Sequence, residues 1–187
     1  MAAPRIGVLA LQGNVREHAA MLARLGADVV EVRKPGDLEG LDGLVLPGGE
    51  STTFMRLMAL SGLDRALAAF EPPVFGTCAG MIVLDRDHLG LVDITVRRNA
   101  YGRQVSSFEA PLELAGEAEP LHGVFIRAPW IEQVGPDVEV LVRFEDHPVA
   151  ARQGRFLVCA FHPELTDDTR LHTLFLESVQ EGRYVRA

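Results

Sequence analysis

Pro73-Val74-Phe75-Gly76-Thr77-Cys78-Ala79-Gly80-Met81 places a cysteine where a predicted buried strand ends and a predicted apolar helix begins. Its centre, Gly-x-Cys-x-Gly, is the cysteine form of the nucleophile elbow, a sharp strand-to-helix turn. Gly76 and Gly80 flank the bend, where a Cβ would clash with the neighbouring strand or helix. The turn raises the Cys78 sulfur clear of the sheet at a helix N-terminus, where partial positive charge favours the nucleophilic thiolate. The amide of Ala79 is placed to donate to an oxyanion.

The simpler alternative for Cys78 is a small buried cysteine between a strand and a helix, because cysteine is among the most buried residue types. The two glycines at these offsets favour the elbow.

Strands and helices alternate with short connections in the first half of the chain. The apolar patterns predict strands at 5–11, 29–32, 43–46 and 74–75, and helices at 15–25, 54–60, 63–70 and from 82 onward. This alternation is typical of a parallel sheet covered by helices on both faces, so we expect a three-layer α/β/α sandwich with a mostly parallel central sheet.

The pattern changes near residue 90. Further strands are predicted at 91–96, 107–114, 123–126, 138–144, 147–151 and 156–161, with few helical periods between them, and an amphipathic helix is predicted at 167–181. We expect these strands of the second half to be antiparallel and additional to the parallel sheet. The sequence lacks a linker or repeat, so we expect residues 1–187 to form one domain whose architecture changes within it.

Composition restricts the possible partners. The chain has 187 residues and a net charge of −8, which disfavours nucleic acid and anionic membrane surfaces as partners. The N-terminal residues lack the pattern of a signal peptide, and the apolar run at 6–11 is too short to span a bilayer. Two cysteines do not make a disulfide framework, so the cytoplasm is the expected compartment.

A second polar cluster follows the apolar run at 156–161. His162 ends the predicted strand and Glu164 follows two residues later, so that in an extended chain both side chains point to one side. Such a pair suits a base and the carboxylate that orients it: His162 would take the Cys78 proton while Glu164 stabilises the imidazolium. Taken alone, His-Pro-Glu would more often be a loop histidine beside a surface glutamate. The elbow reverses that preference.

Pro47-Gly48-Gly49-Glu50-Ser51 ends the third predicted strand, at the sheet edge where active sites of α/β proteins gather. Its glycines expose backbone amides, which suits an oxyanion hole, and the alternative is a plain strand-to-helix turn with a serine or threonine helix cap. Cys159 lies within an apolar run and is expected in the core. The histidines other than His162 show no ligand-like spacing, so no metal site is expected.

Together these features resemble the class I, triad-type glutamine amidotransferases, and more closely the glutaminase subunits of pyridoxal 5′-phosphate synthases. The motifs that carry the resemblance are Gly7-Val8-Leu9-Ala10-Leu11-Gln12-Gly13, Arg16-Glu17-His18, Leu46-Pro47-Gly48-Gly49-Glu50-Ser51-Thr52-Thr53, Phe75-Gly76-Thr77-Cys78-Ala79-Gly80, Arg98-Asn99, Tyr101-Gly102-Arg103-Gln104, Ser107-Phe108-Glu109, Gly123-Val124-Phe125-Ile126-Arg127-Ala128-Pro129 and Phe161-His162-Pro163-Glu164-Leu165-Thr166. They span nearly the whole chain. The resemblance implies the flavodoxin-like fold of class I glutamine amidotransferases.

The resemblance also implies an activity and its residues. The catalytic triad would be Cys78, His162 and Glu164, with the amides of Gly49 and Ala79 as the oxyanion hole. The L-glutamine site would be lined by Gly49, Glu50, Ser51, Arg98, Ile126 and Arg127, and Gln12 would lie near the oxyanion turn and sense the partner. The ammonia would pass to a TIM-barrel synthase subunit, in a hetero-oligomer, that builds pyridoxal 5′-phosphate from ribose 5-phosphate and glyceraldehyde 3-phosphate. The glutaminase itself needs no cofactor.

The chain departs from the family pattern in one place. Between the elbow helix and His88, relatives carry a longer, glycine-containing segment, of which only Asp85-Arg86-Asp87 remains here. We therefore expect altered packing beside the site. Two other functions remain open: a free-standing cysteine hydrolase that acts on γ-glutamyl compounds or peptides, and a regulatory module with a vestigial triad. The intact cysteine, histidine and glutamate argue against the second.

Overall fold

A nine-stranded sheet with the order β2-β1-β3-β4-β11-β10-β9-β6-β7 runs through the molecule in the computed structural model, which describes residues 2–102 and 107–186. Its first five strands are parallel: β2 (Asp28–Val32), β1 (Arg5–Leu9), β3 (Gly43–Leu46), β4 (Val74–Thr77) and β11 (Phe156–Cys159). These strands are short apolar runs, and three of them (β3, β4 and β11) are buried at every position. Complete burial is what a sheet covered on both faces requires.

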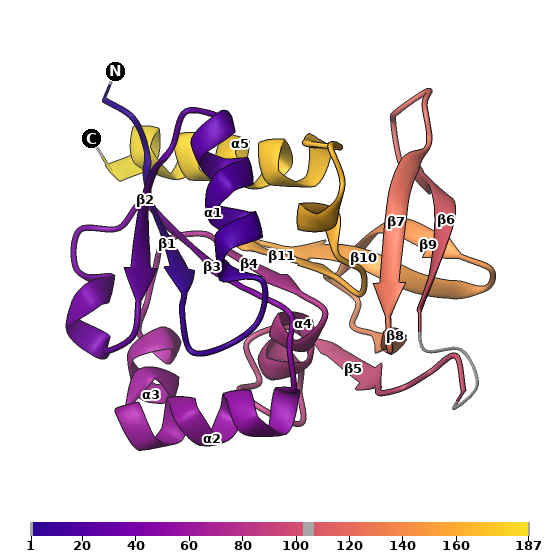
Figure 1. The fold of residues 1–187 in the computed structure, drawn as a ribbon, viewed down its shortest axis with the longest axis horizontal. Helices are drawn as coiled ribbons and strands as arrows, with labels where there is room; N and C mark the ends of the chain where they lie inside the picture. Colours follow the sequence, from indigo (N-terminus) through magenta and orange to yellow (C-terminus); the bar gives the residue numbers. More distant parts are fainter. Residues whose placement is uncertain (1, 103–106, 187) are drawn as a thin grey trace.

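Helices cover both faces of this parallel half (Figure 1). α1 (Val15–Arg24) and α5 (Arg170–Arg186) lie on one face, and α2 (Ser51–Ser61), α3 (Leu63–Ala68) and α4 (Ala79–Leu84) lie on the other. Two short 3₁₀ turns, η1 (Pro35–Leu38) and η2 (Pro163–Leu165), complete the helical elements. The predicted three-layer α/β/α arrangement is confirmed.

The second half of the chain extends the sheet with antiparallel strands. β10 (His147–Gln153) pairs with β11, followed by β9 (Glu139–Phe144), β6 (Ser107–Leu114) and β7 (Leu121–Ile126). An aromatic cluster packs here, with the rings of Phe108 and Phe125 stacked at 4.6 Å and Phe144 beside both. This cluster joins the core of the antiparallel half to that of the parallel half through Phe161.

One local prediction for the second half was wrong, and one strand was not predicted. The strand expected at 91–96 begins only at Ile94, because the amides of Leu91 and Val92 instead turn back to the carbonyl of Leu84. That strand, β5 (Ile94–Arg97), pairs with β8 (Trp130–Val134), which the sequence pattern did not reveal. β8 has only one fully buried residue, Ile131, so its apolar alternation is weak.

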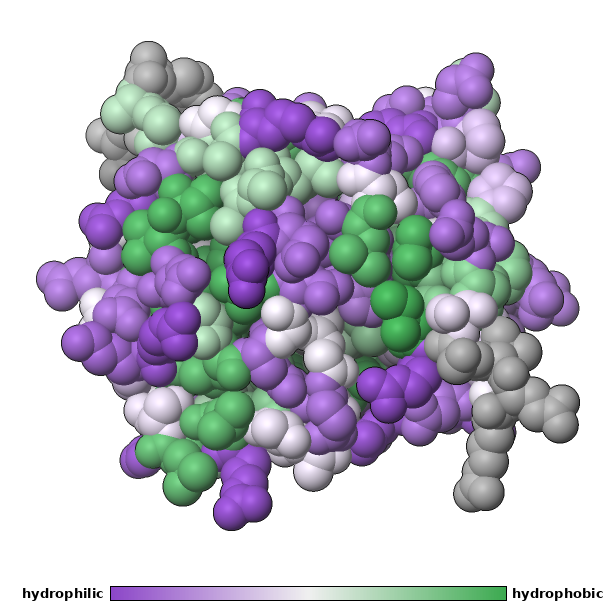
Figure 2. Space-filling model, viewed as in Figure 1, coloured by the Kyte–Doolittle hydropathy of each residue, from purple (hydrophilic) through white to green (hydrophobic). Residues whose placement is uncertain are grey.

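No helix within the described residues is both long enough and apolar enough to cross a bilayer. On the face seen in Figure 2, apolar residues form small, separate patches among polar ones.

Candidate active site

Cys78 sits at a strained turn between β4 and α4. Its backbone has φ 48° and ψ −104°, a conformation that residues other than glycine rarely adopt. The turn is tight: a Cβ on Gly80 would collide with the carbonyl of Leu46, and one on Gly76 would lie 2.8 Å from the backbone of Gly80. The two glycines of the elbow are therefore required by close backbone approach, as the sequence predicted.

Cys78 and His162, the predicted nucleophile and base, follow two adjacent strands. β4 pairs in parallel with β11, and the amide of Cys78 donates to the carbonyl of Cys159 at 2.8 Å. The chain leaving β11 then reaches His162 within three residues. Cys78 is only 6% exposed, so its side chain is more enclosed than the sequence suggested, although it lines a pocket.

His162 and Glu164 form a buried pair, joined by a 2.7 Å contact between Nδ1 of the imidazole and Oε1 of the carboxylate. The sequence argument assumed an extended chain between the two residues. The chain instead turns there, because Pro163 begins the 3₁₀ turn η2. The turn still brings the two groups together. With Glu164 ionised, Nδ1–H donates to Oε1, and Nε2 is free to accept the thiol proton.

The protonation states of this pair depend on each other. Burial alone would lower the pKa of His162, but hydrogen bonds to Cys78 and Glu164, together with their charges, raise it to about 10. Burial would likewise raise the pKa of Glu164, but the nearby imidazoles of His18 and His162 and a hydrogen bond from Asn14 lower it to about 2. The arrangement therefore favours a carboxylate beside an imidazolium, the state that follows transfer of the cysteine proton.

The glycine-rich turn lies against this pair. A Cβ on Gly48 would collide with the His162 ring and lie 3.2 Å from the Cβ of Cys78. Gly49 has φ +149°, and Glu50 accepts hydrogen bonds from Thr52 and Thr53 at the start of α2, which lower its pKa to about 2. A helix cap is therefore also present at this turn, but the capping residue is Glu50 and not the serine or threonine that the alternative assumed.

Gln12 reaches this turn from the end of β1. Its Nε2 donates to the carbonyl of Glu50 at 2.5 Å, and its side chain lies against Gly49. The resemblance placed Gln12 near this glycine-rich turn, and the structure has it there.

A pocket of about 270 Å³ opens beside Cys78 and His162. All six residues predicted to bind substrate line it: Gly49, Glu50, Ser51, Arg98, Ile126 and Arg127. Arg98 comes within 3.5 Å of the Glu50 carboxylate and of the Thr52 hydroxyl. Glu164, Ala79 and Gln12 are not among the lining residues; Ala79 starts α4 behind the sulfur, and Glu164 lies behind the imidazole. Of the motifs behind the resemblance, Arg103 and Gln104 lie outside the described residues.

Backbone strain gathers at this pocket. Among the described residues, four that are not glycine have a positive φ: Cys78, Asn99, Arg127 and Glu145. The first three line the pocket. Strained residues concentrate at functional sites, where the surrounding structure must hold them.

Asp85-Arg86-Asp87, the segment expected to be short, forms a compact turn after α4. The carboxylate of Asp85, 1% exposed, accepts hydrogen bonds from the amides of Asp87 and His88 and lies 2.7 Å from Nδ1 of His88. Burial raises the pKa of Asp85 despite these contacts. The segment therefore satisfies its own polar groups close to the elbow helix.

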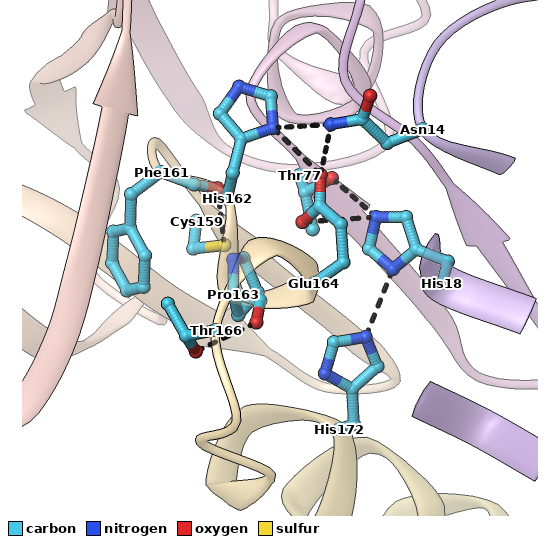
Figure 3. A network of polar contacts seen from close by, with 10 residues as sticks. All are labelled: Asn14, His18, Thr77, Cys159, Phe161, His162, Pro163, Glu164, Thr166 and His172. Atoms are coloured by element: carbon cyan, nitrogen blue, oxygen red, sulfur yellow. Dashed lines mark hydrogen bonds and ion pairs between the residues drawn. The ribbon is translucent and has the colours of Figure 1, made fainter. Parts of the chain in front are cut away.

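Sequence reasoning missed several groups that surround the triad (Figure 3). Nδ2 of Asn14 donates to Glu164 Oε1 at 2.9 Å, and His18, Thr77 and His172 form a buried polar network behind it. The polar residues just after β1 were the available signal, because the ends of neighbouring parallel strands meet at one edge.

Comparison with known proteins agrees with this geometry. Residues 8–181 match the model of the SNO glutamine amidotransferase family. The chain belongs to this family. It is 56% identical over 193 residues to a protein of Parafrankia sp. (strain EAN1pec) named pyridoxal 5′-phosphate synthase subunit PdxT, with 96% of this chain and 95% of that one covered. A PdxT of Geobacillus kaustophilus (strain HTA426) is also 56% identical, over 189 residues and 96% of each chain.

Solved structures support the fold of this SNO family chain. A crystal structure described as a glutamine amidotransferase has a TM-score of 0.88 and 48% sequence identity, covering 94% of this chain and 98% of that one. The crystal structure of a putative GMP synthase protein from Thermoplasma acidophilum has a TM-score of 0.79 over 100% of this chain and 98% of its own, at 17% identity, and shows a shared fold.

Proposed function

We propose that this chain is the glutaminase subunit of a pyridoxal 5′-phosphate synthase and hydrolyses L-glutamine to L-glutamate and ammonia. The observation that carries the proposal is a pocket lined by Cys78, by His162 of the buried His162–Glu164 pair, and by all six predicted substrate residues. The names of the relatives, which match nearly the full length of both chains, supply the biosynthetic role.

The chemistry follows from the triad. His162 takes the proton of Cys78, and the thiolate attacks the side-chain amide carbon of glutamine. The tetrahedral intermediate collapses to a thioester as the imidazolium gives its proton to the leaving ammonia. His162 then activates a water molecule, which releases glutamate and restores the thiol. Glu164 holds the imidazole in the correct tautomer and stabilises its positive charge.

Backbone amides and the pocket residues complete the proposed site. The amides of Gly49 and Ala79 would donate to the oxyanion of the tetrahedral intermediate. Arg98 and Arg127 bring guanidinium groups to the pocket, which suit the α-carboxylate of glutamine. Ile126 provides an apolar contact for the methylene groups.

A synthase partner receives the ammonia in this proposal. The partner is a TIM-barrel protein that forms a hetero-oligomer with this chain, as the family resemblance implies. Gln12 is its proposed sensor, because Gln12 holds the carbonyl of Glu50 next to Gly49. Glycines let the turn change its peptide orientation at low cost, so a partner that binds one orientation would shift the population toward it. The two unpaired cysteines suit a cytoplasmic location.

The test is the rate of glutamate release by the chain alone and with a stoichiometric excess of the synthase partner, at one glutamine concentration. We expect a low rate alone and a much higher rate in the complex. If the rate is unchanged although the complex has formed, the hypothesis that the partner controls the orientation of the oxyanion turn is wrong.

The comparisons do not favour a free-standing hydrolase of γ-glutamyl compounds or peptides. A diazoketone analogue of glutamine separates the two functions. It should label Cys78 faster when the synthase is bound, and a free-standing hydrolase would be labelled at one rate in both conditions.

A further inference from the structure

Two buried histidines lie directly behind the triad carboxylate (Figure 3). His18 is on the first turn of α1 and His172 is near the start of α5, and both are fully buried. Nδ1 of His18 lies 3.0 Å from Nε2 of His172. On its other side, Nε2 of His18 lies 3.1 Å from Oγ1 of Thr77 and 3.4 Å from Oε2 of Glu164. The pair therefore connects α5 to the triad.

Both imidazoles are neutral at physiological pH. Burial lowers the pKa of His18, and it lowers that of His172 to about 3. Besides burial, Glu164, His162 and Glu17 act on the pKa of His18, and His18 itself, Glu164 and Arg24 act on the pKa of His172. The ring of Phe75 stands edge-on to both imidazoles and excludes water from them.

A neutral imidazole carries one N–H, so the contacts determine which nitrogen holds it. Within the described residues, Nδ1 of His172 and Oε2 of Glu164 have no hydrogen-bond partner. If His172 carries its proton on Nε2, it donates to Nδ1 of His18. The nitrogen left without a partner is then Nδ1 of His172, which carries no proton and buries no unpaired donor. His18 then carries its proton on Nε2, directed at Thr77 and at the Glu164 carboxylate.

The opposite pair of tautomers, with the proton on Nδ1 of both histidines, is less stable for two reasons. An Nδ1–H on His18 would donate to His172, which would then bury an N–H on its own Nδ1 without an acceptor. The bare Nε2 of His18 would also face the lone pairs of the ionised Oε2 of Glu164 at 3.4 Å. The first arrangement is therefore the stable one.

We propose that His18 is a positioning residue for Glu164, held in its Nε2–H tautomer by His172. Its N–H lies 3.4 Å from Oε2 and stabilises the charge of that oxygen without a full hydrogen bond, while His162 and Asn14 donate to Oε1. With Oε1 hydrogen-bonded and Oε2 facing an N–H, the carboxylate keeps its plane and its charge, and the imidazole of His162 stays aimed at Cys78. This inference rests on the proposed glutaminase activity, and it adds two residues behind the triad.

Two substitutions at position 18 separate the proposed role from simple packing. In His18→Gln, the amide nitrogen takes roughly the place of Nε2 and keeps a donor toward Glu164. In His18→Asn, the amide nitrogen takes roughly the place of Nδ1, so that Glu164 loses the donor that faced it. Val179→Ala, a buried truncation elsewhere on α5, controls for loss of stability. Activity is measured in the complex with the synthase partner.

We expect His18→Asn to lower kcat by about 10- to 100-fold with little change in KM, and His18→Gln to restore most of that loss. Without the N–H donor the pKa of Glu164 rises, so the acid limb of the kcat/KM profile should move to higher pH in His18→Asn only. Val179→Ala should lower Tm without moving the profile. Equal losses in the two His18 variants, or an unmoved acid limb, would overturn the proposal.

A readout that needs no activity keeps this test apart from that of the proposed function. Imidazole ¹⁵N chemical shifts of the intact chain should show a proton on Nε2 of both His18 and His172. A proton on Nδ1 of His18 would overturn the tautomer assignment whatever the substrate. If the shifts agree but the wild-type complex releases no glutamate, the proposed function fails and the proposal that rests on it fails with it.

Discussion

The backbone amide of Cys78 donates a 2.8 Å hydrogen bond to the carbonyl of Cys159. This bond joins the carboxyl ends of β4 and β11, so that Cys78, just after β4, lies beside Cys159, the last residue of β11. Their surroundings differ. Cys78 lines the pocket, whereas Cys159 is fully enclosed and burial raises the pKa of its thiol well above the usual value.

The two cysteines form a matched pair for testing the nucleophile. Cys78→Ala should abolish glutamate release, because Cys159, the other thiol, does not line the pocket. Cys159→Ala should keep the activity and lose about 1–3 kcal/mol of stability, as expected for a buried truncation. Glutamate release and thermal melting of both variants are the measurements. Residual turnover in the Cys78 variant would contradict the assignment.

Gly48→Ala should disable the site with little effect on the fold. The new methyl group would collide with the His162 ring, and such a displacement of a catalytic group costs about 100-fold in rate. Gly36→Ala is the control, because a Cβ there meets open space; it should keep full activity and change stability by less than about 1 kcal/mol. The measurements are kcat and the midpoint of urea unfolding. Equal activity of the two variants would rule out the predicted contact.

Asn14 supports the same oxygen of Glu164 that accepts from His162. Asn14→Ala removes a hydrogen bond to a charged group, so kcat should fall about tenfold. Asn14→Asp keeps the shape but places a carboxylate beside a carboxylate, which raises the pKa of Glu164 and should cost more. Steady-state kinetics at constant pH compare the two. A milder effect of the aspartate variant would show that Asn14 acts only through its volume.

The raised pKa of His162 predicts a pH dependence of stability. A group whose pKa is higher in the folded state stabilises the protein fully below its unfolded pKa of 6.5 and ceases to do so as the pH rises toward about 10. The free-energy difference between wild type and His162→Gln should therefore be constant just below pH 6.5 and shrink above it. Urea unfolding at a series of pH values measures this difference. A difference that grows with pH would mean that the imidazole is held neutral.

The sequence predicted the elements that local pattern determines. Ser107–Leu114 alternates buried and exposed residues and was predicted with its observed bounds, as was the apolar run Gly43–Leu46. β8 was missed because its partner β5 lies far along the chain, and the hydrogen bonds that define it depend on that pairing. Leu91 was misplaced because its amide bonds to Leu84, a contact of the turn rather than of a strand.

The same distinction applies to the site. Cys78, His162 and Glu164 carry local signatures, a glycine-flanked turn and a strand end, and could be named from the sequence. His18 stood in a motif of the family resemblance, but neither its role nor that of His172 could be predicted, because their contact exists only after α1 and α5 pack on one face of the sheet. Asn14 donates to Glu164, and this contact too depends on the tertiary fold, because it forms where the ends of neighbouring strands meet.

The pairing of β4 with β11 also has a consequence for the order in which the site forms during translation. The strained turn that carries Cys78 belongs to the part of the chain that is synthesised first, whereas β11 and the base that follows it emerge after the antiparallel strands. β11 then inserts between β4 and β10, so it occupies an inner place in a sheet whose other parallel strands were made much earlier. A nascent chain thus carries Cys78 without its proposed base, His162, until translation is nearly complete, and by the proposed mechanism it releases no ammonia before that stage.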